Sequence, residues 1–373
     1  MNELKILHTS DWHLGITSWV GSRSVDRTTE ILQALDEIYS KTLEFQPDVV
    51  FITGDVLHIR SNPSVESVES IVKYLKIFSD IAPVVMIFGN HDWKGLRSLK
   101  ELRLENLKIV DKPEIFEITG KRGQKIKVFP LPYVEISSLI SRIDNKDERI
   151  EKLHFEIEKL IRYYEKEATS DWNIMAVHGL IDGLKISGIE RRTELVIKRQ
   201  LFPTAMDYIA LGHFHGMLKI LDMPPAWYSG SPIYFDFGER NEEKGALLIK
   251  LIKGESPKID KIKVKVKELK VINLEGKGLK ALEQLEKKIK DFDGYVKVVL
   301  DDRDLIGEIF GRFENVVKVD YIKEESEISY QENAETRGIN FLEMYKEYVK
   351  VKYPEISDEM VKEMKEFLEE VEE

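Results

Sequence analysis

Three stretches of sequence decide the fold: residues 5–13 (KILHTSDWH), residues 49–58 (VVFITGDVLH) and residues 84–92 (VVMIFGNHD). Each is a short apolar run, rich in β-branched residues, followed at once by a turn that carries Gly, Asp, Asn or His. Such runs predict buried strands of a parallel sheet. Ligands of α/β sheets collect beyond the carboxyl ends of the strands. The three polar turns therefore mark a candidate site.

The same pattern returns further along the chain. Residues 126–129, 174–178 and 208–211 also read as buried strands, and the last two lead into His178-Gly179 and Gly212-His213-Phe214-His215. Amphipathic helices are expected between strands, over residues 31–42, 68–78 and 146–167, because their apolar residues recur at helical spacing. Strands that alternate with helices predict an α/β layered domain.

Composition narrows the class of protein. The chain has 373 residues, 42% of them hydrophobic, no cysteine and a net charge of −11. The lack of cysteine excludes disulfides and thiol nucleophiles, so any metal must be held by oxygen and nitrogen ligands. We expect a cytoplasmic protein, because no apolar stretch is long enough to span a membrane and the start lacks the pattern of a signal peptide. The acidic net charge argues against a simple nucleic-acid binder, because such proteins neutralise phosphates with Lys and Arg. An acidic protein that acts on phosphates would need bound cations and local basic patches.

The sequence predicts four segments. Residues 1–260 carry the polar turns, and residues 268–322 follow a strand–helix–strand–helix–strand pattern that indicates a smaller second domain. Residues 323–337 are polar and read as a linker. Residues 338–373 predict two helices with apolar stripes. These stripes either fold back onto the main domain or dock on another protein, and the sequence leaves both possibilities open.

Six of the eight histidines lie in the five polar turns. Taken singly, each motif has an ordinary structural explanation, such as an Asp that caps a turn or a histidine packed in the core. Together they offer seven oxygen or nitrogen ligands: Asp11, His13, Asp55, Asn90, His178, His213 and His215. Seven ligands are too many for one transition metal but suit two ions bridged by a carboxylate, and Asp55, on the central strand, is the expected bridge. Two ions can clamp a phosphate, which predicts phosphoester hydrolysis.

The order Asp-x-His, Gly-Asp-x-x-His, Gly-Asn-His-Asp, His and Gly-His-x-His resembles the calcineurin-like metallophosphoesterases, whose fold is a four-layer α/β sandwich. Within them, residues 7–15 (LHTSDWHLG) and His58 resemble the DNA double-strand-break-repair nucleases of the SbcD or MRE-eleven type. The resemblance implies that Asp11, His13, Asp55 and His215 hold one metal and that Asp55, Asn90, His178 and His213 hold the other. It also implies that His91 is the catalytic histidine, protonating the leaving 3′ oxygen, and that His58 assists at the phosphate.

The resemblance further implies a nuclease with two Mn²⁺ ions per chain, acting as a 3′ to 5′ exonuclease on duplex ends and as an endonuclease on single-stranded or hairpin DNA. It implies a homodimer formed through residues 65–78 and 95–104, a capping role for residues 268–322, and a coiled-coil ABC-type ATPase of the SbcC or Rad-fifty type bound by residues 338–373. Basic residues near the polar turns would contact DNA phosphates, namely Arg23, Arg27, Arg60, Lys94 and Arg97.

Two other functions are compatible with the motifs. One is a phosphatase or small-molecule phosphodiesterase built on the same metal centre, although such an enzyme needs no arm that binds a partner. The other is a scaffold without catalysis, which predicts that metal ligands have been lost. No ligand position of the family pattern is missing from this sequence.

Overall fold

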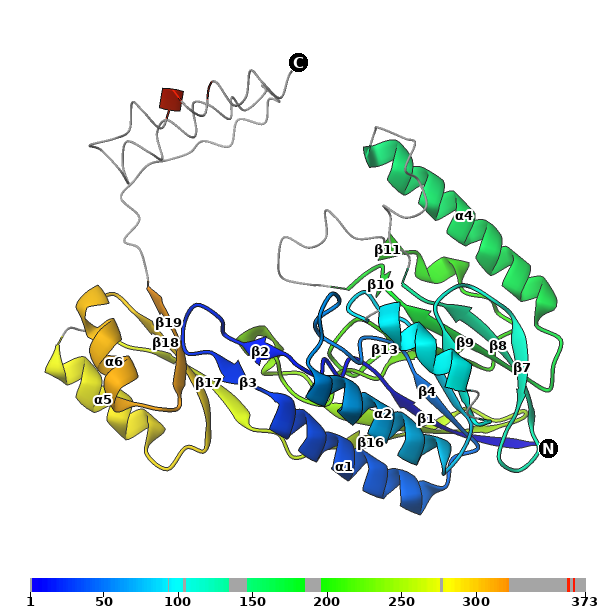
Figure 1. Cartoon of the computed structure of the whole chain (residues 1–373), viewed down its shortest axis with the longest axis horizontal. Coiled ribbons are helices and arrows are strands. Elements are labelled where there is room, and N and C mark those ends of the chain that lie inside the picture. Colours follow the sequence, from blue (N-terminus) through cyan, green and yellow to red (C-terminus); the bar gives the residue numbers. More distant parts are fainter. Residues whose placement is uncertain are drawn as a thin grey trace. The chain divides into compact units, whose positions relative to one another are not determined.

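The computed structural model describes residues 2–92, 94–102, 105–133, 146–184, 196–275 and 278–321, together with residues 361, 362 and 365 (Figure 1). The chain divides into two compact units, residues 1–323 and residues 324–373. The predicted linker and, apart from those three positions, the predicted C-terminal helices lie outside the described residues. The helices and strands with assigned bounds all belong to the first unit.

One six-stranded sheet contains the first three predicted strands. Its order is β16-β15-β1-β4-β5-β6, in which β1, β4, β5 and β6 are parallel to one another and β15 runs antiparallel to both of its neighbours, β1 and β16. The strands span Glu3–Thr9 (β1), Val49–Ile52 (β4), Val84–Ile87 (β5), Leu107–Val110 (β6), Gly245–Ile252 (β15) and Lys258–Lys263 (β16). All four residues of β4 and of β5 are buried, which explains their unbroken apolar sequence.

A second six-stranded sheet holds the later predicted strands. Its order is β13-β14-β12-β9-β8-β7, in which β14, β12, β9 and β8 are parallel and the edge strands β13 and β7 are antiparallel. The strands span Phe116–Thr119 (β7), Lys125–Leu131 (β8), Trp172–His178 (β9), Tyr208–Gly212 (β12), Leu218–Leu221 (β13) and Ala226–Tyr228 (β14). Pairing of Gly212 with His178 brings the carboxyl ends of β9 and β12 together.

Helices cover the outer face of each sheet (Figure 1). Helices α1 (Thr28–Phe45) and α2 (Val65–Ser79) pack on the first sheet, and α4 (Lys146–Glu167) packs on the second. Alternate residues of a strand point to opposite faces, so in β1 Leu7 faces the helices while Ile6 faces the other sheet. The result is a helix, sheet, sheet and helix stack, which confirms the predicted four-layer α/β sandwich.

Residues 268–321 form a three-stranded parallel sheet with two helices. The order is β17 (Glu268–Asn273), α5 (Leu279–Ile289), β18 (Gly294–Leu300), α6 (Ile306–Arg312) and β19 (Val316–Tyr321), the alternation that the sequence predicts. This part has a hydrophobic core of its own. A second cluster, formed by Trp19, Phe237, Tyr295 and Val317, joins it to the four-layer part of the same unit.

The remaining elements are short. They are the strand pairs β2 (Thr17–Ser18) with β3 (Val25–Asp26) and β10 (Leu180–Ile181) with β11 (Val196–Ile197), and the 3₁₀ helices η1 (Lys94–Leu102), η3 (Arg199–Leu201), η4 (Phe237–Glu239) and η5 (Arg303–Leu305). Over the described part of the chain, no helix has the length and hydrophobicity that a membrane span requires.

Candidate metal centre

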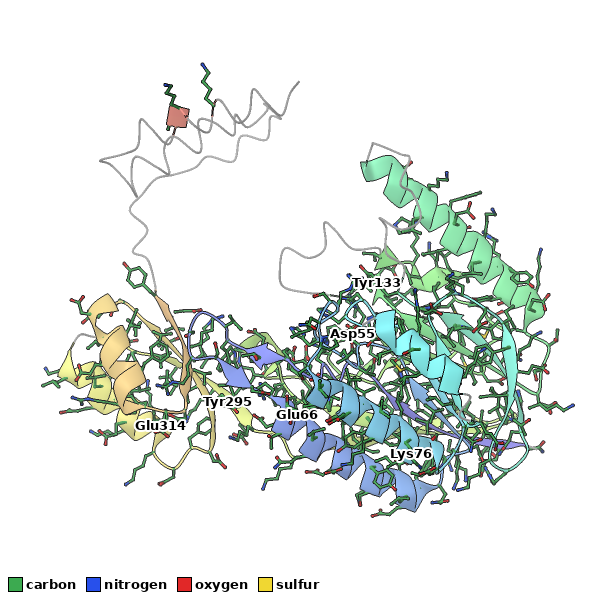
Figure 2. All side chains as sticks on the ribbon, viewed as in Figure 1. Asp55, Glu66, Lys76, Tyr133, Tyr295 and Glu314 are labelled. Carbon is green, nitrogen blue, oxygen red and sulfur yellow. The ribbon has the colours of Figure 1, made fainter. Side chains whose placement is uncertain are left out.

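The structure brings all seven predicted ligands together. Asp11 and His13 follow β1, Asp55 follows β4 and Asn90 follows β5 in the first sheet, while His178 ends β9 and His213 and His215 follow β12 in the second. The two sheets lie face to face with these strand ends on a common rim, where Asp55 is labelled in Figure 2. The site is therefore built from both sheets, and neither sheet could form it alone.

Four of the seven residues have left-handed backbones. The φ angles are 53° at Asp11, 49° at His13, 52° at Asp55 and 103° at His213. Such conformations cost residues other than glycine about 1–3 kcal/mol each and persist only where the surroundings hold them. The first two loops hold each other, because the Asp11 N–H donates to the Gly54 carbonyl and the His13 N–H to the Asp55 carbonyl, both at 2.9 Å.

The glycines that precede the ligands are required by close packing. A Cβ atom on Gly89 would lie 2.2 Å from Asp55 Oδ1, and one on Gly54 would lie 2.4 Å from His178 Nδ1. A Cβ atom on Gly212 would lie 2.1 Å from the Thr53 carbonyl oxygen. Each strand end thus approaches its neighbour more closely than a side chain allows, which explains the pairs Gly-Asp, Gly-Asn and Gly-His.

We expect Gly89→Ala to lower the free energy of unfolding by about 1–3 kcal/mol, the usual cost of overpacking. The new methyl group must displace Asp55, whose backbone nitrogen would also lie only 2.5 Å away. Urea unfolding measures the effect. Gly307→Ala is the matched control, because a Cβ atom there meets nothing within 4 Å and the residue lies in α6. Equal stability of the Gly89→Ala variant and the wild type would contradict the packing explanation.

Asp11, His13 and His215 form one ligand group, with their ligand atoms within 4.8 Å of one another. The Nε2 atoms of His13 and His215 are 3.2 Å apart. Two imidazole nitrogens that bind one ion at right angles, each about 2.1 Å from it, lie about 3 Å apart. The spacing therefore suits two ligands of a shared cation.

Asp55, His178 and His213 form a second group of the same kind, and Asn90 lies beside it. Asn90 Oδ1 is 3.0 Å from His178 Nε2 and 3.1 Å from His213 Nδ1. The His178 Nδ1–H donates to the Thr53 carbonyl at 2.6 Å, so the lone pair of neutral His178 is on Nε2, facing Asn90. Asp55 Oδ2 lies 3.4 Å from His178 Nε2 and 3.7 Å from His13 Nε2, between the two groups.

The electrostatics of the rim favour positive charge. Burial by itself would raise the pKa of Asp55, yet the adjacent His178 and His13 hold it below its usual range. Burial likewise opposes protonation of His178, but the Asp55 carboxylate outweighs it and raises the pKa of His178 to about 9. Lone pairs of carboxylate, amide and imidazole converge here in a buried place. This donor set fits two divalent cations that share Asp55.

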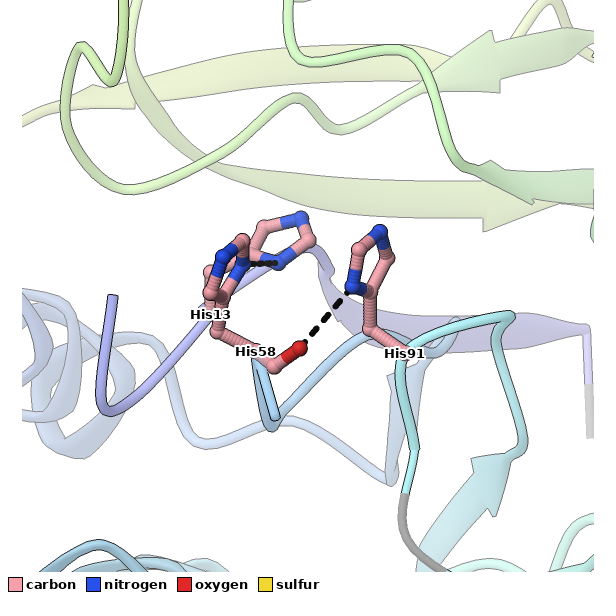
Figure 3. Close-up of side chains that lie close together, drawn as sticks. All are labelled: His13, His58 and His91. Atoms are coloured by element: carbon pink, nitrogen blue, oxygen red, sulfur yellow. Dashed lines mark hydrogen bonds between the residues drawn. The ribbon is translucent and has the colours of Figure 1, made fainter. Parts of the chain in front are cut away.

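His91 and His58 stand beside the first ligand group (Figure 3). The backbone N–H of His91 donates to Asp55 Oδ1 at 2.7 Å, and its ring Nδ1–H donates to the His58 carbonyl at 2.9 Å. The two rings stack with centroids 5.1 Å apart, and His58 Nδ1 is 3.3 Å from His13 Nδ1. With Nδ1 engaged, Nε2 is the atom through which the His91 ring can exchange a proton with a bound molecule.

Asp92, to which the sequence pattern assigned no role, ties the β4 and β5 loops together. Its Oδ1 accepts the backbone N–H groups of Val56 (2.9 Å) and Leu57 (3.2 Å). Its Oδ2 accepts those of Asp55 (2.9 Å) and Gly89 (2.7 Å). Asp92 could have been noticed in the sequence as the last residue of Gly-Asn-His-Asp. Its role could not, because the four N–H groups that it accepts come from two loops that only the fold brings together.

Three further residues at the site belong to none of the five turns. The ring of Phe235 lies edge to face against His13 and His215, with centroids 5.2 and 5.3 Å away, and Tyr133 stacks on His213 at 6.3 Å. Glu239 Oε1 accepts the His215 Nδ1–H at 2.7 Å. Nothing in the local sequence distinguishes these three residues from ordinary core or surface positions.

The structure corrects one predicted DNA contact, Arg27, and shows protein partners for Arg23 and Arg97. Arg27 is 1% exposed and binds Glu30 and the Tyr234 carbonyl, so it cannot reach a phosphate. Arg23 donates to the Phe313 carbonyl at 2.7 Å and to that of Phe310, which joins β2–β3 to α6. Arg60 and Arg97 are exposed, and Arg97 pairs with Asp111. The Lys94 side chain lies outside the described residues.

Comparison with known proteins defines the class. The family model of the calcineurin-like phosphoesterases matches residues 4–217, which contain all seven grouped ligands together with His58 and His91. The chain belongs to the calcineurin-like phosphoesterase family.

Among individual proteins, the chain is similar to the SbcD subunit of the nuclease SbcCD from Staphylococcus epidermidis. The two are 30% identical over 257 residues, which cover 65% of this chain and 64% of that relative. The alignment thus spans less than two thirds of the relative's length. A more distant structural similarity is to a dimetal phosphatase from Danio rerio, with 10% identity and a TM-score of 0.45, covering 67% of this chain and 93% of that one.

Proposed function

We propose that the chain is a manganese-dependent DNA nuclease of double-strand-break repair. It degrades duplex ends as a 3′ to 5′ exonuclease and cuts single-stranded or hairpin DNA as an endonuclease. The observation that carries the proposal is the pair of ligand groups with Asp55 Oδ2 between them, and with the His91 backbone N–H hydrogen-bonded to the same carboxylate. The similarity to a nuclease subunit supports DNA as the substrate.

The ligand set would hold two ions, one on Asp11, His13, Asp55 and His215 and the other on Asp55, Asn90, His178 and His213. Bound there, two Mn²⁺ ions would supply Lewis-acid activation of the phosphate and of the attacking water. As an imidazolium, His91 supplies the proton: its Nδ1–H stays on the His58 carbonyl, its Nε2–H goes to the leaving 3′ oxygen, and the neutral ring remains with its proton on Nδ1. His58 orients that ring by stacking on it.

The other parts of the chain have roles in this proposal. Residues 268–322 act as a capping domain, residues 323–337 as a linker, and residues 338–373 bind a coiled-coil ABC-type ATPase of the SbcC or Rad-fifty type. The homodimer forms through residues 65–78 and 95–104. Val65 at the start of α2 is 74% exposed and the nearby Ile59 is 42% exposed, so apolar surface is available there.

DNA binding by a chain of net charge −11 depends on the cations and on local basic residues. Arg60 and Arg97 are our candidates for phosphate contacts, because both are exposed on segments that follow the His58 and Asn90 loops. Contacts to phosphates position a strand without reading its bases. Binding should therefore be independent of sequence and sensitive to salt.

The experiment that tests the proposal compares two substrates. Purified protein with Mn²⁺ is incubated with end-labelled linear duplex DNA and, separately, with a phosphomonoester. We expect metal-dependent release of nucleotides from DNA and little hydrolysis of the phosphomonoester. Hydrolysis of the phosphomonoester with intact DNA would favour the alternative function, a phosphatase or small-molecule phosphodiesterase. Absence of bound metal at micromolar Mn²⁺ would overturn both and favour a scaffold.

A further inference from the structure

We propose that Glu239 is a positioning residue that sets the tautomer and the orientation of the His215 ring, and that Lys244 holds Glu239 in place for this task. The inference rests on the proposed metal centre. It adds residues that orient a metal ligand without binding the metal, and these residues lie in a part of the chain that carries none of the metal motifs. Three observations carry it: the contacts of the carboxylate, the burial of the lysine and the contrast with His178 and His13.

The two oxygens of Glu239 have separate partners. Oε1 faces His215 Nδ1 at 2.7 Å, whereas Oε2 accepts the Phe235 backbone N–H at 3.0 Å and the Lys244 ammonium at 2.7 Å. A carboxylate can only accept hydrogen bonds, so His215 must carry its proton on Nδ1. In the neutral ring Nε2 then carries the lone pair, 3.2 Å from His13 Nε2, which is the arrangement a shared cation needs.

Lys244 is a buried cation that contacts both Glu239 and His215. The residue is 4% exposed, and its ammonium donates to Glu239, to Glu242 at 2.9 Å, to the His215 carbonyl at 2.9 Å and to Ser231 Oγ at 3.0 Å. It therefore grips both the side chain that orients His215 and the backbone of His215 itself. A lysine buried this deeply is uncommon unless it is paired.

His215 differs from His178 and His13 in being oriented by a carboxylate. His178 uses the Thr53 carbonyl, and His13 Nδ1 faces another imidazole, that of His58. Glu239 thus acts on a ligand of the first group. Its loss should affect one of the two ions and leave the other bound.

Glu239→Gln tests the inference sharply, because the surroundings determine how the new amide must lie. The Phe235 N–H and the Lys244 ammonium require an acceptor, so the amide oxygen turns to them and the amide NH₂ faces His215 Nδ1. The NH₂ group then selects the tautomer with the proton on Nε2, which cannot bind a metal. We expect Mn²⁺ to bind the first group about 10- to 100-fold more weakly, while the second group keeps its affinity.

Two readouts separate positioning from a general loss of structure. Calorimetric Mn²⁺ titration of the full chain should show one of the two binding steps weakened by that factor, and ¹⁵N NMR of the metal-free protein should show His215 protonated on Nε2 instead of Nδ1. His215→Asn identifies the His215 signal and the affected step. Asp236→Asn is the matched control: it neutralises an exposed carboxylate that caps the same helix η4, and it should change neither readout.

The outcomes distinguish this inference from the proposed function. A wild-type chain that binds no Mn²⁺ would overturn the proposed metal centre. A wild-type chain that binds two ions, together with a Glu239→Gln variant that binds both equally well and keeps the proton on Nδ1, would overturn the positioning role alone. Loss of both steps with an unchanged tautomer would also overturn it, because the effect would then be structural.

Discussion

Replacing His91 by Asn is expected to lower kcat on DNA about 10²- to 10⁴-fold, the usual contribution of a positioned proton donor. Asn keeps the backbone N–H that donates to Asp55 Oδ1, but it removes the imidazole whose Nδ1 is held by the His58 carbonyl. The Mn²⁺ affinity should stay close to that of the wild type, because the His91 side chain belongs to neither of the two carboxylate-containing ligand groups. Kinetics on duplex DNA and calorimetric Mn²⁺ titration measure the two quantities.

The leaving group provides the decisive comparison for His91. A nitrophenyl phosphodiester releases a stable anion that needs no proton, so the variant should cleave it almost as fast as the wild type. His154→Asn, the same change in helix α4, serves as the control. Equal losses on DNA and on the nitrophenyl ester would contradict the proton-donor role, and loss of Mn²⁺ would make His91 a ligand instead.

Asp55→Asn is expected to abolish activity by weakening the binding of both ions. The amide oxygen can keep the His91 N–H bond, which places the NH₂ group where Oδ2 now lies, between His178 Nε2 at 3.4 Å and His13 Nε2 at 3.7 Å. That group donates a hydrogen bond to an imidazole lone pair that a cation would otherwise use. We expect both affinities to fall more than about 100-fold, beyond the effect of losing an outer contact.

The metal-free stability of the Asp55→Asn variant is the internal check. The NH₂ group of the new amide can donate only to a neutral imidazole, so we expect the free energy of unfolding without metal to be kept above about pH 9, where His178 of the wild type has lost its proton. Asp48→Asn is the opposite case, because Asp48 lies just before β4, accepts the Lys5 N–H and pairs with Arg122. It should lower stability and leave Mn²⁺ binding intact. If Asp55→Asn lost only one ion, Asp55 would not be shared.

The layered fold and the grouping of the seven candidate ligands could be predicted because they depend on local sequence. The apolar runs of β4, β5 and β12 are continuous, since both faces of each strand are buried, and polar residues follow their carboxyl ends, as they do in β1. Parallel pairing puts those ends on one rim, so position along the chain was enough to place Asp11, Asp55 and Asn90 together.

The prediction that Arg27 contacts DNA was wrong, because it rested on local sequence alone. It lies close to the first polar turn, like a residue that could reach a phosphate, yet its guanidinium donates to the Tyr234 carbonyl, 207 positions away, and lies over the rings of Trp19 and Tyr295. A charge can be buried when such partners surround it. Those partners come from three separate segments, so the local sequence around Arg27 does not predict its burial.

By itself, the sequence determined the buried strands whose ends carry the polar turns and the helices between them, and it predicted which residues could offer ligands to two metal ions, since these properties follow from the order and chemistry of neighbouring residues. Only the tertiary structure decided that Asp92 joins two loops, that Gly54, Gly89 and Gly212 leave no room for a side chain, and that Glu239 and Lys244 serve His215. The physical reason is that hydrogen-bond direction, close packing and burial arise between segments that are distant along the chain and become neighbours only when the sheets are stacked.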